Sequence, residues 1–401
     1  MIPKGKLMKY LIFIGDGMAD RPIESLGNKT PLEAAKKENI DYIAKRSVYG
    51  MTLPTPLGMV PESDTANLAL LGYDPRVYSK GRSPLEALSM GIPMSDTQTA
   101  IRCNIVTLSE DSSDYEALTM IDHSSGEIDN ESAAELIRYI DEHLGTEKRK
   151  FHPGVSYRHC LMWDNCPTPP EFSRPHDILG RKIKEYLPKS EEYLELMKKS
   201  YQLLKDHPIN LKRKAEGKNP ANSIWLWANG MKPALPSFEE RFGLKGVAIS
   251  AVDLIKGIAI CAGMDVINVE GATGNIKTNF SGKAKAAVDA LEKYDLVYLH
   301  VEAPDECGHQ GNAEEKVKSI EYLDEMLGYI LENVKGMDLR ILFCPDHPTP
   351  IEIRTHSPES VPFIIYDTRK EEDGVDTFSE RSCEKGMNIP NGFKLIDTFI
   401  E

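Results

Sequence analysis

Leu11-Ile-Phe-Ile-Gly-Asp-Gly17 is the stretch that decides the expected fold. Four apolar residues end in an acidic residue between two glycines, which is typical of a buried strand leading into a polar turn. The apolar runs at 296–301 and 341–344 likewise end shortly before acidic and histidine residues. Because the carboxyl ends of parallel strands meet at one sheet edge, these runs predict a parallel sheet that gathers the polar side chains.

The pattern of strands and helices extends this expectation. Thr30-Pro31-Leu32-Glu33 is a capping box that predicts one helix to about Arg46. Strands and helices then alternate after residue 246, with strands expected at 247–252, 266–269, 296–301, 341–344 and 361–366, and helices at 282–293 and 313–334. Alternation of this kind predicts an α/β core with a mostly parallel sheet sandwiched by helices. The core is expected to be discontinuous, formed by residues 1–90 and 246–401.

The middle of the chain, residues 91–245, has weaker periodicity, frequent proline and all three tryptophans. Core-type segments flank it on both sides, so we expect an inserted second domain of α+β type. Such an insert could act as a substrate-binding cap whose two connections form a hinge.

Composition restricts the partners. The 401 residues carry a net charge of -14, which argues against general binding to nucleic acid or to anionic membranes. A small anionic substrate remains compatible, because local cations can reverse the field inside one site. Seven cysteines without a Cys-x-x-Cys pair, and no apolar run long enough to span a membrane, predict a cytoplasmic protein. Nothing in the sequence indicates an oligomeric state.

Seven residues near predicted strand ends are candidate metal ligands, and one of them is also a candidate nucleophile: Asp16, Ser63, Asp305, His309, Asp346, His347 and His356. Asp and His are ligands for hard or borderline divalent metals. Together they could hold two metals beside a serine, the equipment needed to move a phosphoryl group through a covalent serine intermediate.

Each candidate also has a plainer interpretation. Ser63 could be only an N-cap. Gly308 favours a tight loop over a helix between Asp305 and His309, and the Pro-bounded pair Asp346-His347 could be an ordinary polar turn. The joint occurrence of these residues at strand ends of one split core favours the site.

Five motifs resemble the alkaline phosphatase superfamily, and within it the archaeal type of cofactor-independent phosphoglycerate mutases. They are Gly15-Asp-Gly-Met-Ala-Asp-Arg-Pro22, Pro61-Glu-Ser-Asp-Thr-Ala-Asn-Leu-Ala-Leu-Leu-Gly-Tyr-Asp-Pro75, Gly81-Arg-Ser-Pro-Leu-Glu-Ala87, Glu302-Ala-Pro-Asp-Glu-Cys-Gly-His309 and Pro345-Asp-His-Pro-Thr-Pro350. The resemblance implies an alkaline-phosphatase-like fold. It also implies interconversion of 3-phosphoglycerate and 2-phosphoglycerate through phosphoserine, without 2,3-bisphosphoglycerate.

The resemblance further implies two metal sites with Ser63 as the nucleophile. One metal would be held by Asp16, Ser63, Asp346 and His347, and the other by Asp305, His309 and His356. Mn²⁺ is expected, and Mg²⁺ or Zn²⁺ would also suit such ligands.

Substrate contacts are expected from Arg102, Arg158, His159 and Lys256, since cationic side chains suit phosphate and carboxylate groups. The chain departs from the archaeal mutases at Asp122-His-Ser-Ser-Gly-Glu127, where an Arg-containing segment is expected. Other segments resemble a bacterial branch proposed to act as homoserine kinase. An ATP-dependent homoserine kinase is therefore the alternative, followed by a phosphatase and by a non-catalytic protein with structural metals.

Overall fold

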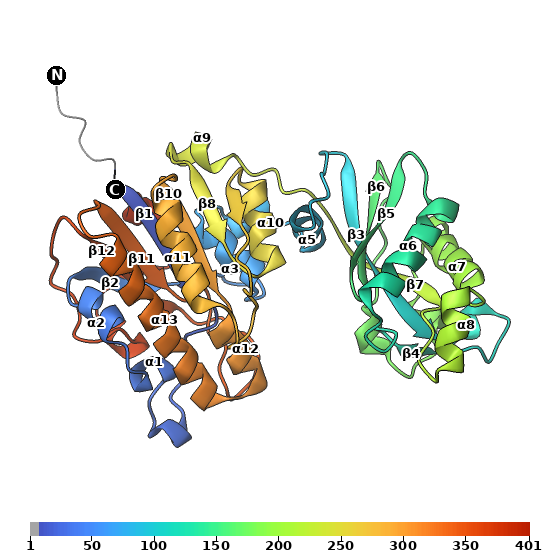
Figure 1. Ribbon diagram of the computed structural model, residues 1–401, viewed down its shortest axis with the longest axis horizontal. Helices are drawn as coiled ribbons and strands as arrows, with labels where there is room; N and C mark the ends of the chain where they lie inside the picture. The colour runs from blue at the N-terminus through green and yellow to red at the C-terminus, as the bar shows by residue number, and fades with distance from the viewer. Residues whose placement is uncertain (1–7) are drawn as a thin grey trace. The chain divides into compact units, whose positions relative to one another are not determined.

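The computed structural model describes residues 8–401 as two compact units (Figure 1). Unit 1 comprises residues 8–79 and 234–401, and unit 2 comprises residues 80–233. Helix α5 (Ser83–Ser89) belongs to unit 2, because Ser83 donates a hydrogen bond to the carbonyl of Ala228 at 2.7 Å. Helix α9 (Phe238–Phe242) belongs to unit 1, where the Phe238 amide donates to the Ala262 carbonyl at 2.7 Å. These contacts separate the units near residues 80 and 233, about ten residues before the expected boundaries at 90 and 245.

An eight-stranded sheet forms the centre of unit 1, in the order β13-β2-β12-β11-β1-β10-β8-β9. Only the pairings of β12 are antiparallel, so the expected mostly parallel sheet is confirmed. The strands are β1 (Lys9–Gly15), β2 (Ser47–Thr52), β8 (Gly246–Ile249), β9 (Asp265–Ile267), β10 (Leu296–Val301), β11 (Leu339–Cys344), β12 (Val361–Asp367) and β13 (Met387–Ile389).

Helices cover both faces of this sheet. Apolar side chains of α2, α11 and α13 form one buried cluster with alternate residues of the central strands. On the other face, Tyr298 of β10 contacts α3 through Asn67, and Tyr10 of β1 packs against Phe399 of α15. The helices of unit 1 are α1 (Pro31–Ala34), α2 (Glu38–Ala44), α3 (Ser63–Leu70), α4 (Pro75–Tyr78), α9, α10 (Asp253–Cys261), α11 (Phe280–Leu291), α12 (Ala303–Gln310), α13 (Ala313–Asn333), α14 (Glu380–Cys383) and α15 (Leu395–Ile400).

The single helix expected from residue 31 to about 46 is two helices, α1 and α2, so this prediction was wrong. Ala35 leaves α1 with an extended backbone, at φ -67° and ψ 142°. A new helix start then forms because Asp324 of α13 accepts the Ile40 amide hydrogen at 2.7 Å. A buried carboxylate from a distant segment thus caps α2, which local sequence could not indicate.

Strand register sets the position of the site. Ile14 of β1 pairs with His300 of β10 on one side and with Cys344 of β11 on the other. Two residues further along each strand, Asp16, Glu302 and Asp346 therefore leave the sheet at the same level. Three acidic residues meet at one edge because the three strands are parallel and in this register.

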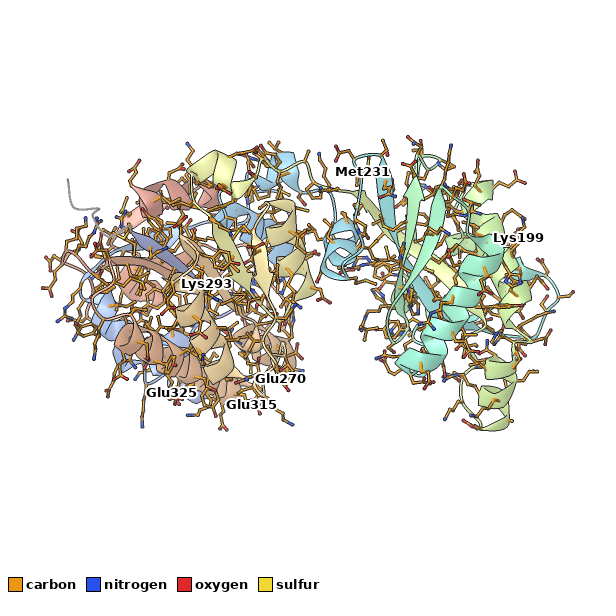
Figure 2. All side chains as sticks on the ribbon, turned by 45° about the horizontal axis from the view of Figure 1, so that its top comes forward. Lys199, Met231, Glu270, Lys293, Glu315 and Glu325 are labelled. Carbon is orange, nitrogen blue, oxygen red and sulfur yellow. The ribbon has the colours of Figure 1, made fainter. Side chains whose placement is uncertain are left out.

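Unit 2 is built on a five-stranded antiparallel sheet in the order β4-β3-β6-β5, with β7 paired to β3. Its strands are β3 (Gln98–Leu108), β4 (Met120–Asp122), β5 (Arg149–Val155), β6 (Arg158–Asp164) and β7 (Ser223–Met231), and its helices are α5, α6 (Asn130–Leu144), α7 (Glu191–Leu204) and α8 (Pro208–Ala215). Residues of α6 and α7 form the core against this sheet. Lys199 of α7, and Glu325 of α13 in unit 1, lie at the surfaces of their units (Figure 2). Within residues 8–401, every helix is too short or too polar to cross a membrane.

Candidate metal centre

The carboxyl edge of the unit 1 sheet carries the buried polar cluster. Asp16 follows β1, and Asp346 and His347 follow β11; all three side chains are at most 2% exposed. Asp305 and His309 lie on α12, which begins two residues after β10. The structure therefore brings together residues that are up to 340 positions apart in the chain.

Three of the predicted residues surround the Nε2 atom of a fourth, His347. This nitrogen lies 3.4 Å from Oδ1 of Asp16, 3.1 Å from Oγ of Ser63 and 3.6 Å from Oδ2 of Asp346. Oδ1 of Asp16 has no hydrogen-bond partner among the described residues although it is buried. An unpartnered buried carboxylate oxygen beside an imidazole nitrogen and a hydroxyl fits a divalent metal site.

The other three predicted residues form an adjacent group. Nε2 of His309 lies 3.1 Å from Asp305 and 3.0 Å from Nε2 of His356, which is 3.4 Å from the other oxygen of Asp305. Nδ1 of His309 faces the Arg354 carbonyl at 3.0 Å, and Nδ1 of His356 faces the Pro61 carbonyl at 2.7 Å. A carbonyl can only accept, so each Nδ1 carries a proton and each Nε2 is left to bind a metal.

The two groups adjoin, since the rings of His347 and His356 stack at 3.9 Å between centroids. The seven predicted residues therefore form one continuous cluster. Its donors are carboxylate oxygens, imidazole nitrogens and one hydroxyl, a set that fits two divalent cations.

Electrostatics make the cluster unfavourable without added positive charge. Burial raises the pKa of Asp16 well above its usual range, and the carboxylates of Asp346, Asp305 and Glu302 raise it further. Burial also opposes ionisation of Asp305, yet hydrogen bonds with His309 and His356 hold its pKa well below its usual range. The pKa of His309 rises to about 9, chiefly through its hydrogen bond with Asp305. Divalent cations would relieve the repulsion among these carboxylates.

Ser63 does not have the local role that its sequence suggests. Glu62 occupies the N-cap position of α3 and Ser63 is the first helical residue, so the N-cap interpretation was wrong. Its Oγ faces His347 instead of a backbone amide. Asn67 lies one turn further along α3, where it donates to the Ser63 carbonyl and to Asp346, both at 2.8 Å. Helix α3 thereby presents a hydroxyl near a helix N-terminus, where anions are stabilised.

The segment from Asp305 to His309 is helical, so the expected tight loop was wrong. The helix begins at Ala303 with Pro304 in its first turn, and Gly311, in the left-handed conformation, ends it. Gly308 is needed for packing: a Cβ there would lie 2.6 Å from the carbonyl oxygen of Thr349. Helical spacing of four residues places Asp305 and His309 on one face.

Two residues of the cluster were missed by the sequence analysis. His300 is fully buried, with Nε2 3.1 Å from Oδ2 of Asp16, and burial lowers its pKa to about 4. Glu302 offers an oxygen within 4.8 Å of Asp16 and Asp305, and its pKa is raised to about 7, mainly by burial. The sequence did contain a signal for both residues: His300 interrupts the apolar run of β10, and Glu302 directly follows the end of that strand.

A buried lysine joins the two loops that carry the cluster. Nζ of Lys316 on α13 donates to Asp20 at 2.7 Å, to the Ala19 carbonyl at 3.2 Å and to the Thr349 carbonyl at 2.8 Å. Asp20 follows the Asp16 turn, and Thr349 follows His347. Lys316 thus holds the turns after β1 and β11 in place.

Replacement of this lysine is expected to destabilise the protein. Lys316→Met leaves Asp20 buried without its counter-ion, so the free energy of unfolding should fall by about 3–5 kcal/mol in a denaturant titration. Lys318→Met, on the same helix but exposed, should change it by less than about 0.5 kcal/mol. Equal effects of the two substitutions would contradict this role for Lys316.

The four predicted substrate contacts lie outside this cluster. Arg102 on β3 is paired with Glu86 and stacks 4.6 Å over Trp227, and His159 is buried, with a pKa lowered to about 3 by burial. Arg158 is exposed and lies 4.4 Å over the Tyr157 ring. These three belong to unit 2, whereas Lys256 lies on α10 of unit 1, 3.3 Å from Asp253.

Comparison with known proteins identifies the fold and the family. Residues 8–388 match the model of the metalloenzyme superfamily. The chain is 46% identical over 401 residues to a Geobacter sulfurreducens protein named probable 2,3-bisphosphoglycerate-independent phosphoglycerate mutase, covering 98% of this chain and 100% of the relative. A Methanosarcina barkeri protein named 2,3-bisphosphoglycerate-independent phosphoglycerate mutase is 48% identical over 387 residues, covering 94% and 96% of the two chains.

Solved structures of similar proteins support the same fold and family. A Pyrococcus horikoshii protein has a TM-score of 0.83 and 32% identity, covering 99% of this chain and 97% of its own. The cofactor-independent phosphoglycerate mutase of Thermoplasma acidophilum has a TM-score of 0.71 and 26% identity, covering 98% and 99%. The resemblance inferred from the sequence motifs is confirmed: the chain belongs to the family of 2,3-bisphosphoglycerate-independent phosphoglycerate mutases, within the metalloenzyme superfamily.

Proposed function

We propose that the protein interconverts 3-phosphoglycerate and 2-phosphoglycerate without 2,3-bisphosphoglycerate. The observation that supports this most is the position of Ser63, whose Oγ lies 3.1 Å from His347 within the cluster of Asp and His side chains. A serine in such a cluster suits transfer through a covalent intermediate, and the mutase names of the relatives supply the substrates.

In this proposal Ser63 Oγ attacks the phosphorus of 3-phosphoglycerate, and the bond from phosphorus to the substrate oxygen breaks. The glycerate formed takes up a proton at that oxygen. The 2-hydroxyl of this glycerate then loses its proton and attacks the phosphorus of the phosphoserine. The bond from phosphorus to Ser63 Oγ breaks, which restores Ser63, and 2-phosphoglycerate leaves. Asn67 would hold Ser63 and Asp346 in their relative positions throughout.

Two divalent cations are proposed as cofactors, one held by Asp16, Ser63, Asp346 and His347 and the other by Asp305, His309 and His356. When bound, they would favour the ionised serine and neutralise phosphate charge. Mn²⁺ suits a mixed shell of carboxylates and imidazoles, and Zn²⁺ or Mg²⁺ are the alternatives.

The role of unit 2 as a substrate-binding cap stays a proposal. Of its three candidates, Arg158 is exposed and suits an anionic substrate best. Arg102 already has a carboxylate partner, and the buried ring of His159 is neutral. Lys256 remains the candidate in unit 1.

Phosphorus NMR distinguishes the mutase from the homoserine kinase. Metal-loaded protein is incubated with 3-phosphoglycerate alone and, separately, with ATP and homoserine. The mutase forms 2-phosphoglycerate without nucleotide, and phosphohomoserine in its place would reject the proposal. The Geobacter, Methanosarcina and Thermoplasma relatives carry mutase names and lend the kinase no support.

Metal binding is expected to depend on pH through His309. Its pKa of about 9 means that the metal-free protein carries a proton on this ring at neutral pH. A metal must displace that proton, so its affinity for the Asp305 group should rise about tenfold per pH unit and level off near pH 9.

Calorimetric titration of metal-free protein with Mn²⁺ at several pH values measures this slope. His143→Asn, at an exposed histidine on α6, should leave it unchanged. An affinity for the Asp305 group that is constant from about pH 6 to about pH 9 would reject displacement of a proton from His309.

A further inference from the structure

Tyr298 lies in the middle of β10 and is fully buried, although it carries a hydroxyl group. This hydroxyl forms a hydrogen bond with Oδ1 of Asn67, which is fully buried on α3. Helix α3 begins at Ser63, one turn before Asn67. The sheet therefore contacts the helix of the proposed nucleophile through a buried polar pair.

Hydrogen bonding fixes the orientation of the Asn67 amide. The end that does not face Tyr298 lies 2.8 Å from the Ser63 carbonyl and 2.8 Å from Oδ2 of Asp346. A carbonyl can only accept a hydrogen bond, so the amide nitrogen of Asn67 must be the atom that faces Ser63. The amide oxygen consequently faces Tyr298, and the Tyr298 hydroxyl must be the donor.

The surroundings of Tyr298 suit a donor. Burial raises the pKa of Tyr298 well above its usual range, and the carboxylate of Asp346 raises it further. A phenol that keeps its proton can donate one hydrogen bond, and Oδ1 of Asn67 is in position to accept it.

Asn67 in turn helps to determine the position of Asp346. Oδ1 of Asp346 accepts the amide hydrogens of Gly17 and His347, at 3.1 and 2.9 Å. Oδ2, which lies 3.6 Å from Nε2 of His347, accepts from Asn67. This second oxygen therefore adjoins the cation site proposed beside Ser63.

We propose that Tyr298 is a positioning residue that locks the Asn67 amide and thereby the two groups it binds, the proposed nucleophile and the Asp346 carboxylate. Without the hydroxyl, Oδ1 of Asn67 would be buried with no partner, which is unfavourable, and the amide would turn or admit water. Ser63 and Asp346 would then lose their common donor. This inference rests on the proposed function, in which both residues bind one metal.

The competing interpretation makes Tyr298 an ordinary core residue. Its ring lies in an apolar strand, and a core role needs only the volume of that ring. Phenylalanine fills nearly the same volume without the hydroxyl. Tyr298→Phe therefore preserves a core role and removes a positioning role.

The substitution is tested in calorimetric titrations of metal-free protein with Mn²⁺ and in turnover measured by phosphorus NMR. Tyr298→Phe should weaken the binding of one ion by about fivefold or more and leave the other unchanged. It should lower kcat by about tenfold, with KM within about threefold of the wild type.

Tyr193→Phe is the matched control. Tyr193 is fully buried in unit 2, and its hydroxyl donates to the Pro167 carbonyl at 2.6 Å. Its loss removes a comparable hydrogen bond outside the cluster, so the affinity for both ions and kcat should stay within about twofold of the wild type.

Tyr298 acts only through Asn67 in this proposal, so the effects of the two substitutions should not add. In Asn67→Ala, which lacks the amide, the further change Tyr298→Phe should alter affinity and kcat by less than about twofold. Unchanged metal affinity in Tyr298→Phe alone, or additive losses in the double variant, would overturn the inference.

Thermal unfolding of the metal-free proteins controls for folding. If Asn67→Ala does not fold, Tyr298→Phe compared with Tyr193→Phe decides alone. A wild type that binds two ions but forms no 2-phosphoglycerate rejects the mutase proposal, while the calorimetric titrations still test the inference. An active wild type whose Tyr298→Phe variant keeps its metal affinity rejects the inference and leaves the mutase proposal standing.

Discussion

Ser63→Ala is expected to abolish interconversion of the phosphoglycerates. The substitution removes the oxygen proposed to carry the phosphoryl group, while the Asp and His side chains around it remain. Loss of a catalytic nucleophile lowers kcat by about 10⁴-fold or more in well-studied enzymes. Phosphorus NMR measures the turnover, and mass spectrometry of acid-quenched protein detects phosphoserine in the wild type and none in the variant.

Ser281→Ala is the matched control, because Ser281 is an exposed serine in the first turn of α11. It should retain wild-type turnover and the phosphoserine signal. Turnover by Ser63→Ala within about tenfold of the wild type would show that another group accepts the phosphoryl group.

Removal of metal is expected to abolish activity to a similar extent. The cluster would lose the positive charge that opposes four neighbouring carboxylates, those of the buried Asp16, Asp305 and Asp346 and of the half-buried Glu302. Several kcal/mol of charge stabilisation in the transition state would be lost, so kcat should fall at least about a thousandfold. Mn²⁺ added back should restore it, and elemental analysis should find two ions per chain.

Substitutions at the cluster should separate the two ions. Asp346→Asn is expected to lose the ion beside Ser63, and Asp305→Asn the ion beside His309 and His356. Asp289→Asn, at an exposed carboxylate on α11, should keep both. Full activity after complete chelation, or one ion per loaded chain, would contradict the dinuclear centre.

Strand positions were predictable because a strand buried on both faces is apolar along its whole length. The run at 296–301 coincides with β10, and those at 341–344 and 361–366 lie within β11 and β12. Polar residues that follow such strands stand out, and they supplied several of the seven proposed site residues, among them Asp16, Asp346 and His347. Local spacing was less informative at Ser63 and at 305–309. Both segments are helical, and both pack against the turn at 347–349, which lies far away in the chain.

Buried charged residues that hold other segments in place were not predictable in the same way. Lys316 and Asp324 lie on the long helix α13, and in sequence they look like ordinary helical charges. Their partners, Asp20 and the Ile40 amide, are more than 280 positions away. Only packing of α13 against the sheet shows that they are buried and paired.

The sequence by itself determined the α/β core and the set of residues that could bind metal, because hydrophobic periodicity and the chemistry of Asp, His and Ser are local properties. Tertiary structure decided how these residues meet. Parallel register aligns Asp16, Glu302 and Asp346 at one edge. Burial turns neighbouring carboxylates into a site that favours bound cations, and hydrogen bonds between distant segments, such as that from Asn67 to Asp346, fix the positions of the cluster residues. Register, burial and hydrogen bonding depend on segments far apart in the chain, so they arise only in the folded molecule.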